Sequence, residues 1–548
     1  MLEAMAKGTG CLANAAEVFG TLADECRDPE TRTRLTRHAV AEASSAVLRT
    51  LTLHQSTEAL LTQLLRCIGN LCADNNTART QLLECGGVAG ISRVLSASGS
   101  ESLVRAAFGA ALNVCLDHGE CTAAMLGSGA LHTYLQGLME APRSVWPVLC
   151  AGLDNLCEHE DALPLFEANS EYMALVLSAM QALMRDEDSD LVRGVLRTLV
   201  WILCEVVEKS AGVRRQLGNA HDVLGMFDIL EYYLRRVEEK ENHYADAVTN
   251  AIVAVSGEDD ALTELFGSEP LMRRLALILS SGESDGLLTA AALCVGNLAR
   301  TDSHCTQLLA DHPAMIRGLI TDRLIPRSVN VRLRHAASGL LKNLCLAQAN
   351  RQPLAEWGLV SAASSHITSA VVPVQANCIG ILRHLASSPS TMPELVQSAF
   401  PGVLDVARTS DVDAVRCEAA RLVAAVAKHV VLECSEARDL INEFDLVAPL
   451  VRLVTGDGAK HLLLRQEGLV ALTVLATQPR HRQEMLRLLE GESELAGVLA
   501  DLLTSGSSAS VPQAALQAAS LVTQLSSSQD SEMEGATVLR SKLLPLLN

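Results

Sequence analysis

Apolar residues recur along most of the chain at spacings of three and four, the period of a helix with one buried face. Each apolar run is short, ends in a polar turn that often contains Gly, and is followed by another run of the same kind. No stretch alternates apolar and polar residues for long enough to predict a sheet. The pattern therefore predicts an all-α protein built from many short amphipathic helices.

One sequence phrase recurs: an apolar helix with a central asparagine, a polar turn and a new amphipathic helix. Its clearest copies carry Asn70, Asn113, Asn155, Asn297 and Asn343. Separations of 43, 42 and 46 residues within this series match the ~40–47-residue period of armadillo and HEAT repeats. Weaker copies, one of them with Asn250, fill the gap after Asn155, and others continue to the C-terminal end. We expect an armadillo-repeat, right-handed superhelical solenoid of about twelve repeats.

The outermost copies are the most degenerate, as expected of repeats that have a neighbour on only one side. We therefore predict degenerate N-terminal capping repeats over residues 1–60, armadillo repeats over 61–510 and C-terminal capping helices over 511–548. A long insertion, EYYLRRVEEKENHYAD, stretches one of the middle repeats.

Composition fits a helical interior, because 49% of the residues are apolar while only 3% are aromatic. The 16 cysteines fall within apolar helical patterns, and we interpret them as buried free thiols. No run of about 20 apolar residues predicts a membrane span, and the N-terminus lacks the pattern of a secretory signal. We expect a monomeric, cytosolic protein that makes no stable membrane insertion.

Known catalytic and metal-binding motifs do not match. The segment that begins with Glu158 and His159 starts like a zinc-protease helix, but Leu163 stands where HExxH needs its second histidine. His335 and His384 lie within apolar patterns, and we interpret them as packing histidines. We expect a protein that is not an enzyme, with no catalytic residues, no metal and no cofactor.

Charge narrows the class of partner. With 44 basic and 64 acidic side chains the net charge is −20, which argues against nucleic acid, whose phosphates require a basic surface. A basic protein partner is favoured instead. Acidic clusters occur over 184–190, 237–246 and 257–260. Solubility alone explains any single cluster, while their shared place in the middle repeats favours a surface that steers a basic partner.

The recurring asparagines allow two interpretations. In a stacked solenoid, residues at one phase of the repeat form a ladder along the exposed groove, where an amide can pair with a partner's backbone. Alternatively, the same amides bond within or between repeats and stabilise the array. The two roles do not exclude each other.

Three segments carry a resemblance to a known family. The segment AVTNAIVAVSGEDDALTELFG is followed by AALCVGNLARTDSHC, whose matching residues are Asn297, Ala299, Arg300, Asp302 and Cys305. With VRLRHAASGLLKNL after them, these segments resemble the SmgGDS family, armadillo proteins that stimulate GDP dissociation from small GTPases. Importin-α-type adaptors fit less well, because the tryptophan that they place four residues before each ladder asparagine is absent here.

The resemblance implies a binder of Rho- and Ras-type GTPases with polybasic, prenylated C-terminal tails, which promotes nucleotide exchange and chaperones the GTPase. The alternative is a general armadillo scaffold for another basic protein. The expected partner-binding residues are Asn250, Asn297, Arg300 and Asn343, together with Glu238, Glu239, Glu241 and Asp246 of the acidic insertion.

Overall fold

A computed structural model describes residues 12–36, 58–96, 99–186, 189–236, 242–282, 284–324, 330–433, 443–456, 461–490, 493–505, 512–526 and 534–547. Within these ranges every regular element is a helix, so the predicted all-α class is confirmed. The chain divides into two compact units, Met1–Leu271 and Met272–Asn548, and the boundary falls within α19 (Glu269–Ser281).

Unit 1 follows a regular order of short and long helices. It contains α2 (Leu12–Glu25), α3 (Pro29–Thr36), α5 (Glu58–Cys72), α6 (Asn76–Glu84), α7 (Gly87–Leu95), α8 (Glu101–Cys115), α9 (Gly119–Gly127), α10 (Ala130–Glu140), η1 (Arg143–Val145), α11 (Trp146–Glu158), α12 (Ala162–Ala168), α13 (Glu171–Met184), α14 (Asp190–Lys209), α15 (Ala211–Gln216), α16 (Ala220–Arg236), α17 (Asn242–Ser256), η3 (Asp259–Ala261) and α18 (Leu262–Gly267).

Unit 2 continues the same order. It contains α20 (Asp285–Leu298), α21 (Asp302–Asp311), α22 (Pro313–Gly318), η4 (Leu319–Leu324), α23 (Val331–Leu344), α24 (Gln348–Glu356), α25 (Leu359–Ser364), α26 (Val372–Leu385), α27 (Met392–Ser398), α28 (Phe400–Thr409), α29 (Asp413–Glu433), α31 (Val447–Thr455), α32 (Leu462–Leu475), α33 (Pro479–Leu488), α34 (Glu494–Ser505), α35 (Pro512–Ser526), α36 (Glu534–Val538), η5 (Leu539–Leu543) and η6 (Leu544–Leu547).

One repeat consists of three helices, and α6, α7 and α8 illustrate how the sequence defines them. The side chain of Asn75 accepts a hydrogen bond from the backbone N–H of Ala78 and so caps the start of α6. Gly86 adopts the left-handed conformation, φ 76°, at the sharp turn from α6 to α7. The longer α8 then packs its apolar face against its neighbours, with Leu103 and Phe108 buried. We call the last helix of each repeat its third helix.

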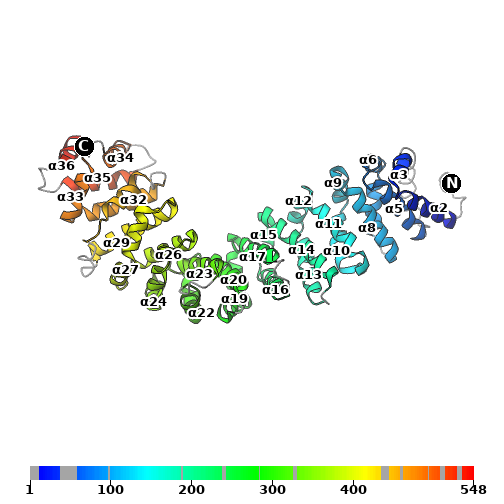
Figure 1. Ribbon diagram of the computed structural model, residues 1–548, viewed down its shortest axis with the longest axis horizontal. Helices are drawn as coiled ribbons and strands as arrows, with labels where there is room; N and C mark the ends of the chain where they lie inside the picture. The colour runs from blue at the N-terminus through cyan, green and yellow to red at the C-terminus, as the bar shows by residue number, and fades with distance from the viewer. Residues whose placement is uncertain are drawn as a thin grey trace. The chain divides into compact units, whose positions relative to one another are not determined.

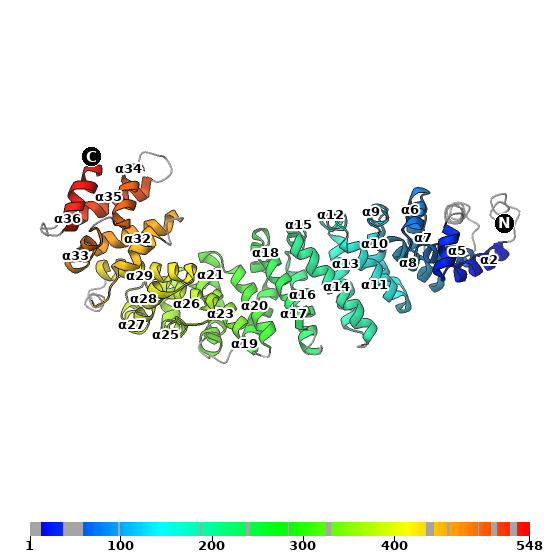
Figure 2. The ribbon, with the colours of Figure 1, turned by 45° about the horizontal axis from the view of Figure 1, so that its top comes forward.

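Third helices stack on one another in chain order within each unit (Figures 1 and 2). They are α2, α5, α8, α11, α14 and α17 in unit 1, and α20, α23, α26, α29, α32 and α35 in unit 2. The core between them is aliphatic, as composition predicts. The described cysteines are free thiols, and most are fully buried, which confirms their interpretation as core residues.

Candidate functional site: the third-helix face

Each third helix leaves one side uncovered by its neighbours. On α23 the exposed or half-buried side chains include His335, Lys342 and Asn343, and on α26 they include Arg383 and His384. Because third helices stack in register, such residues align from one repeat to the next. We call this surface the third-helix face.

Ladder asparagines use their side-chain amides to join consecutive third helices. In each recorded case the Nδ2 group donates to a backbone carbonyl of the preceding third helix: Asn70 to Ala23 at 2.7 Å, Asn113 to Gly69 at 3.1 Å and Asn343 to Gly296 at 2.9 Å. All three asparagines are half-buried. The amide N–H is thus used within the protein, and each amide oxygen can accept a hydrogen bond from a ligand on the face.

Acidic side chains gather on the third-helix face of unit 1. Asp154 and Glu158 come from α11, and Glu205 and Glu208 come from the adjacent α14. The hydroxyl of Thr198 on α14 donates to Asp154 Oδ2 at 3.3 Å, which fixes the two helices' relative placement there. Burial, and to a smaller extent the negative charge of Glu158, raises the pKa of the Asp154 carboxyl. Glu205 forms an ion pair with Lys209 on the same helix, so Asp154, Glu158 and Glu208 supply the acidic charge of this part of the face.

A groove of about 650 Å³ lies over α5 and α8 of the same unit. Asn70 and Asn113 line it together with Arg66 and Arg105. Arg66 forms an ion pair with Asp24 of α2 at 2.7 Å, so its charge is partly neutralised. This part of the face presents amides and paired charges, in contrast to the acidic surface of α11 and α14.

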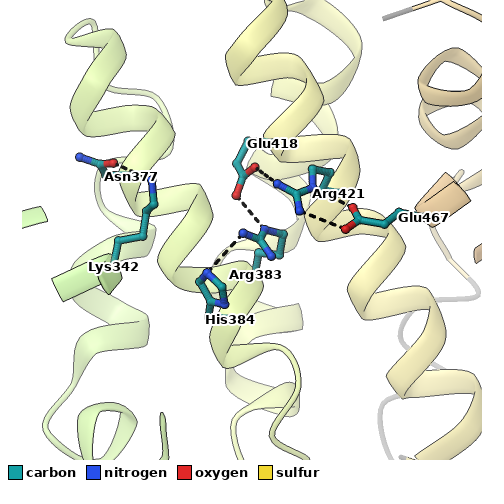
Figure 3. Close-up of polar contacts among 7 residues, drawn as sticks. All are labelled: Lys342, Asn377, Arg383, His384, Glu418, Arg421 and Glu467. Atoms are coloured by element: carbon teal, nitrogen blue, oxygen red, sulfur yellow. Dashed lines mark hydrogen bonds and ion pairs between the residues drawn. The ribbon is translucent and has the colours of Figure 1, made fainter. Parts of the chain in front are cut away.

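Unit 2 carries a polar network across α26, α29 and α32 (Figure 3). Glu418 accepts from Arg383 Nε at 2.7 Å and, through its other oxygen, from Arg421 Nη1 at 2.9 Å. Arg421 also forms a bidentate pair with Glu467, at 2.7 and 3.0 Å. Bidentate guanidinium–carboxylate pairs are geometrically specific, so the network fixes three consecutive third helices in one register.

Glu418 is the centre of this network. Burial by itself would raise the pKa of its carboxyl, but the Arg383 and Arg421 guanidiniums outweigh that effect and hold the pKa below its usual value. The hydrogen bonds that Arg421 donates to Glu467, and the negative charge of Glu418, raise the pKa of Arg421 above its usual value. Glu418 and Arg421 are therefore both ionised at neutral pH.

Next to the network, Lys342 Nζ donates to the amide oxygen of Asn377 at 3.3 Å (Figure 3). Asn377 in turn donates to the Ser338 hydroxyl at 3.2 Å. These contacts join α23 to α26 through neutral partners.

The structure corrects the interpretation of both histidines as packing residues. His335 is exposed on α23, and His384 is half-buried with Nε2 lying 3.3 Å from Arg383 Nη2. Burial and the nearby positive charges, Arg383 first, lower the pKa of His384 to about 4. Helical periodicity misassigned them because it cannot tell a core-facing position from one at the edge of a groove.

Comparison with known proteins identifies similar chains. No family model matches. The Rap1 GTPase-GDP dissociation stimulator 1-A of Xenopus laevis is 22% identical over 457 residues, which is 80% of this chain and 72% of that protein. The GTPase-GDP dissociation stimulator vimar of Drosophila melanogaster is 24% identical over 548 residues, 90% of this chain and 83% of that protein. These matches support an SmgGDS-like family.

A solved structure supports the fold of this chain. It is described as "A conserved phosphorylation switch controls the interaction between cadherin and beta-catenin in vitro and in vivo", and it aligns with a TM-score of 0.58 and 15% identity over 93% of this chain and 99% of that one. At this identity the likeness concerns the fold alone. Together with the stacked three-helix repeats, it confirms the predicted armadillo-type solenoid.

The predicted partner-binding residues differ in their placement. Asn297 and Asn343 each immediately precede the last residue of their third helix, α20 and α23, and both are half-buried. Asn250 is exposed but lies more than one turn before the end of α17, so it does not share their phase. Arg300 is exposed just after α20.

The acidic insertion is only partly within the described residues. Asp246 is exposed on α17. Glu238, Glu239 and Glu241 lie outside the residues that the structure describes.

Sequence reasoning missed the acidic surface of α11 and α14 and the network around Glu418. A usable signal was present for part of each: Asp154, Lys342 and Arg383 directly precede the ladder position of their repeats.

Within the described ranges, no three His, Cys, Asp or Glu side chains gather in a way that could hold a metal ion. In the same ranges no helix combines the length and the hydropathy needed to cross a membrane.

Proposed function

We propose that this chain stimulates GDP dissociation from small GTPases of the Rho and Ras type. The observation that carries the proposal is its similarity to three GTPase-GDP dissociation stimulators over 77–90% of its length. We also propose that it works by binding rather than by enzymatic chemistry, without a cofactor, as a monomer in the cytosol.

The acidic part of the third-helix face gives this proposal a physical basis. A polybasic GTPase tail would lie against Asp154, Glu158, Glu205 and Glu208, with Asp246 on the next third helix. Opposite charges on two surfaces accelerate association and set the orientation of the encounter. A prenyl group on the same tail would be shielded from water while the tail is bound, and this is the chaperone role that we propose.

Nucleotide release would follow from differential affinity. A binding partner shifts an equilibrium only by as much as it binds one state better than the other. We propose that Asn297, Arg300 and Asn343 contact the GTPase core and favour its nucleotide-free shape. Since Asn343 Nδ2 already donates to Gly296, its amide oxygen would be the group that accepts from the GTPase backbone.

The test is release of a fluorescent GDP analogue from Rap1 and from a Rho-type GTPase, each with and without its basic tail. We expect the full chain to accelerate release, and more strongly when the tail is present. The double reversal Glu158→Lys, Glu208→Lys should reduce the acceleration at least tenfold.

The matched control is the double reversal Glu84→Lys, Glu120→Lys, because these two exposed glutamates lie on the first helices α6 and α9. It changes net charge equally and should leave exchange within twofold of the unmodified chain. If no GTPase in the panel releases its nucleotide faster, the proposed function is wrong. If both double variants lose activity equally, net charge rather than the acidic face is responsible.

A further inference from the structure

Two cysteine thiols from neighbouring repeats of unit 1 lie in contact with each other. Cys26 directly follows α2, and Cys67 lies within α5, the third helix that packs against α2. The two side chains are hydrogen-bonded to each other, and both residues are 0% exposed. Hydrogen-bonded thiols on separate helices are the arrangement from which a disulfide forms with little movement of the backbone.

An ion pair beside the thiols holds their two helices in register. Arg66 directly precedes Cys67. Its Nη2 group lies 2.7 Å from Oδ1 of Asp24, two residues before Cys26. The ladder contact from Asn70 to α2, described above, joins the same two helices. The contact between the thiols is therefore a consequence of how α2 and α5 pack.

The two thiols are not equivalent. The hydrogen bond with Cys67 lowers the pKa of the Cys26 thiol, and the positive charge of Arg32 acts in the same direction, against burial and the charge of Glu25. The same hydrogen bond, together with burial, raises the pKa of Cys67. Cys26 is therefore the nucleophile of the pair, because the thiolate and not the thiol reacts. Cys67 keeps its proton and acts as the hydrogen-bond donor.

Two other buried thiols of unit 1 provide a contrast. The thiol of Cys115 donates to the backbone carbonyl of Cys121 at 3.9 Å, and that of Cys121 donates to the carbonyl of Arg79 at 3.6 Å. Burial raises the pKa of Cys115 to about 12 and that of Cys121 to about 11. Both groups are protonated at neutral pH and are poor nucleophiles. They serve as internal controls for Cys26.

We propose that Cys26 and Cys67 form a reversible disulfide when the chain meets a hydroperoxide. The Cys26 thiolate attacks one peroxide oxygen, so that an S–O bond forms, the O–O bond breaks and water or an alcohol leaves. The sulfur of Cys67 then attacks the resulting sulfenic acid, the S–S bond forms, and the hydroxyl group leaves as water with the Cys67 proton. The thiols lose two electrons, which reduce the peroxide. The proposal does not rest on the GTPase function.

Local opening of α2 gives the peroxide access to these buried thiols. Among the described third helices, α2 packs against α5 alone, whereas α5 packs between α2 and α8. A helix with one such neighbour separates from the array at a lower free-energy cost than a helix with two. The disulfide, with a sulfur–sulfur distance of ~2.05 Å, then ties α2 to α5 and suppresses this opening.

The test uses the reduced full chain treated with hydrogen peroxide. Free thiols are blocked with iodoacetamide, and disulfide-linked peptides are identified by mass spectrometry after digestion. We expect the Cys26–Cys67 link to be at least fivefold more abundant than a link between any other two cysteines. Dithiothreitol should reverse it, because a disulfide, unlike a sulfinic acid, is reduced by thiols.

Variants assign the two roles. In Cys67→Ala the sulfenic acid has no second thiol to react with, so dimedone, which traps sulfenic acids, should label Cys26 at least fivefold more than in the unmodified chain. In Cys26→Ala dimedone should not label Cys67. The matched control Cys121→Ala removes another buried thiol and should leave the yield of the disulfide within twofold. Circular dichroism checks the fold of each variant, and the peptide mapping of the unmodified chain does not depend on them.

Three results would each overturn the proposal. The first is that Cys26 and Cys67 both remain free after peroxide treatment of the unmodified chain. Equal yields of several different cysteine pairs would show oxidation of unfolded chains instead of a preformed pair. Dimedone labelling of Cys67 in Cys26→Ala would contradict the assignment of Cys26 as the nucleophile. No GTPase is present in this assay, so its failure and that of the proposed GTPase function are distinguishable.

Discussion

Asn343 of α23 closes the C-terminal end of α20 in the preceding repeat by donating its side-chain amide to the carbonyl of Gly296 at 2.9 Å. The carbonyls of a helix's last turn lack donors from the helix itself. Here the backbone N–H of Arg300, which would bond to Gly296 in a continuing helix, donates to Leu298 instead. The recurring asparagine is thus an inter-repeat cap as well as a candidate ligand-binding group.

Replacing this cap should reduce stability. Asn343→Ala removes the donor to Gly296, and we expect a loss of about 1–2 kcal/mol, typical of a half-buried hydrogen bond whose acceptor is left without a partner. Thermal unfolding of the full chain measures the effect. Asn250→Ala, at an exposed position, is the control and should change stability by less than about 0.5 kcal/mol. Equal stability of the two variants would show that Asn343 does not cap the end of α20.

Glu418 should be the most sensitive residue of the network in unit 2. Glu418→Gln leaves Arg383 and Arg421 without a shared carboxylate, and breaking a largely buried ion pair costs about 3 kcal/mol. Glu467→Gln should cost less, because the Glu467 side chain is 35% exposed while that of Glu418 is 17% exposed. Urea unfolding of both variants measures the two losses in the free energy of unfolding. A larger loss for Glu467→Gln would contradict the central role of Glu418.

His384 should make unit 2 sensitive to mild acid. Its pKa in the folded chain is lowered to about 4 by burial and by Arg383, Arg351 and Lys342, whereas an unfolded histidine titrates near 6.5. The unfolded state therefore binds a proton first as the pH falls. The stability that His384 contributes is full above pH ~6.5 and is lost between there and pH ~4.

The acid sensitivity attributed to His384 is tested by replacing it with asparagine, the residue found at the ladder position of other repeats. Between pH 7 and pH 5 the unmodified chain should lose about 1 kcal/mol more than His384→Asn, allowing for the partial exposure of the ring. Differential scanning calorimetry at the two pH values gives the difference. The stability that Glu418 contributes is also lost as the pH falls, but at lower pH, because the pKa of its carboxyl in the folded chain is below the usual value. Parallel pH profiles for the two proteins would exclude the His384 effect.

Close packing at Gly535 should make the C-terminal end intolerant of a side chain. A Cβ atom at this position would lie 1.7 Å from the carbonyl oxygen of Leu486 on α33. Gly535→Ala must therefore separate α36 from α33. We expect the free energy of unfolding to fall by about 2 kcal/mol and proteolysis after residue 526 to become faster. Gly497→Ala, where a Cβ meets nothing within 4 Å, should instead stabilise α34 slightly. Equal proteolysis rates for the two variants would refute the contact.

GTPase association should depend on salt. Charges on the acidic part of the face, such as Glu158 and Glu208, are exposed, and ions screen exposed charges beyond ~10 Å at 0.1 M. The association rate of a GTPase with a basic tail should therefore fall at least tenfold between low and moderate salt, as stopped-flow measurements can show. A rate that does not change with salt would reject the acidic face as a steering surface.

The sequence by itself determined the helical class and the repeat, because both are local properties. Apolar spacing of three and four specifies which side of each helix is buried, and the recurrence of Asn297 and Asn343 at one phase sets the period. It also identified the cysteines as core residues, since a small thiol within an apolar helix side is buried wherever that side packs.

Tertiary structure decided which of these residues share a surface and what they contact. Asp154 and Thr198, or Arg383 and Glu418, belong to different repeats, and only the packing of one repeat on the next brings them together. Asn343 shows the same limit: its position was evident from the pattern, but its acceptor, Gly296, is 47 residues away. The net charge of −20 likewise gave no indication of the network around Glu418, because a sum over the chain carries no information about which charges lie side by side or which are already paired.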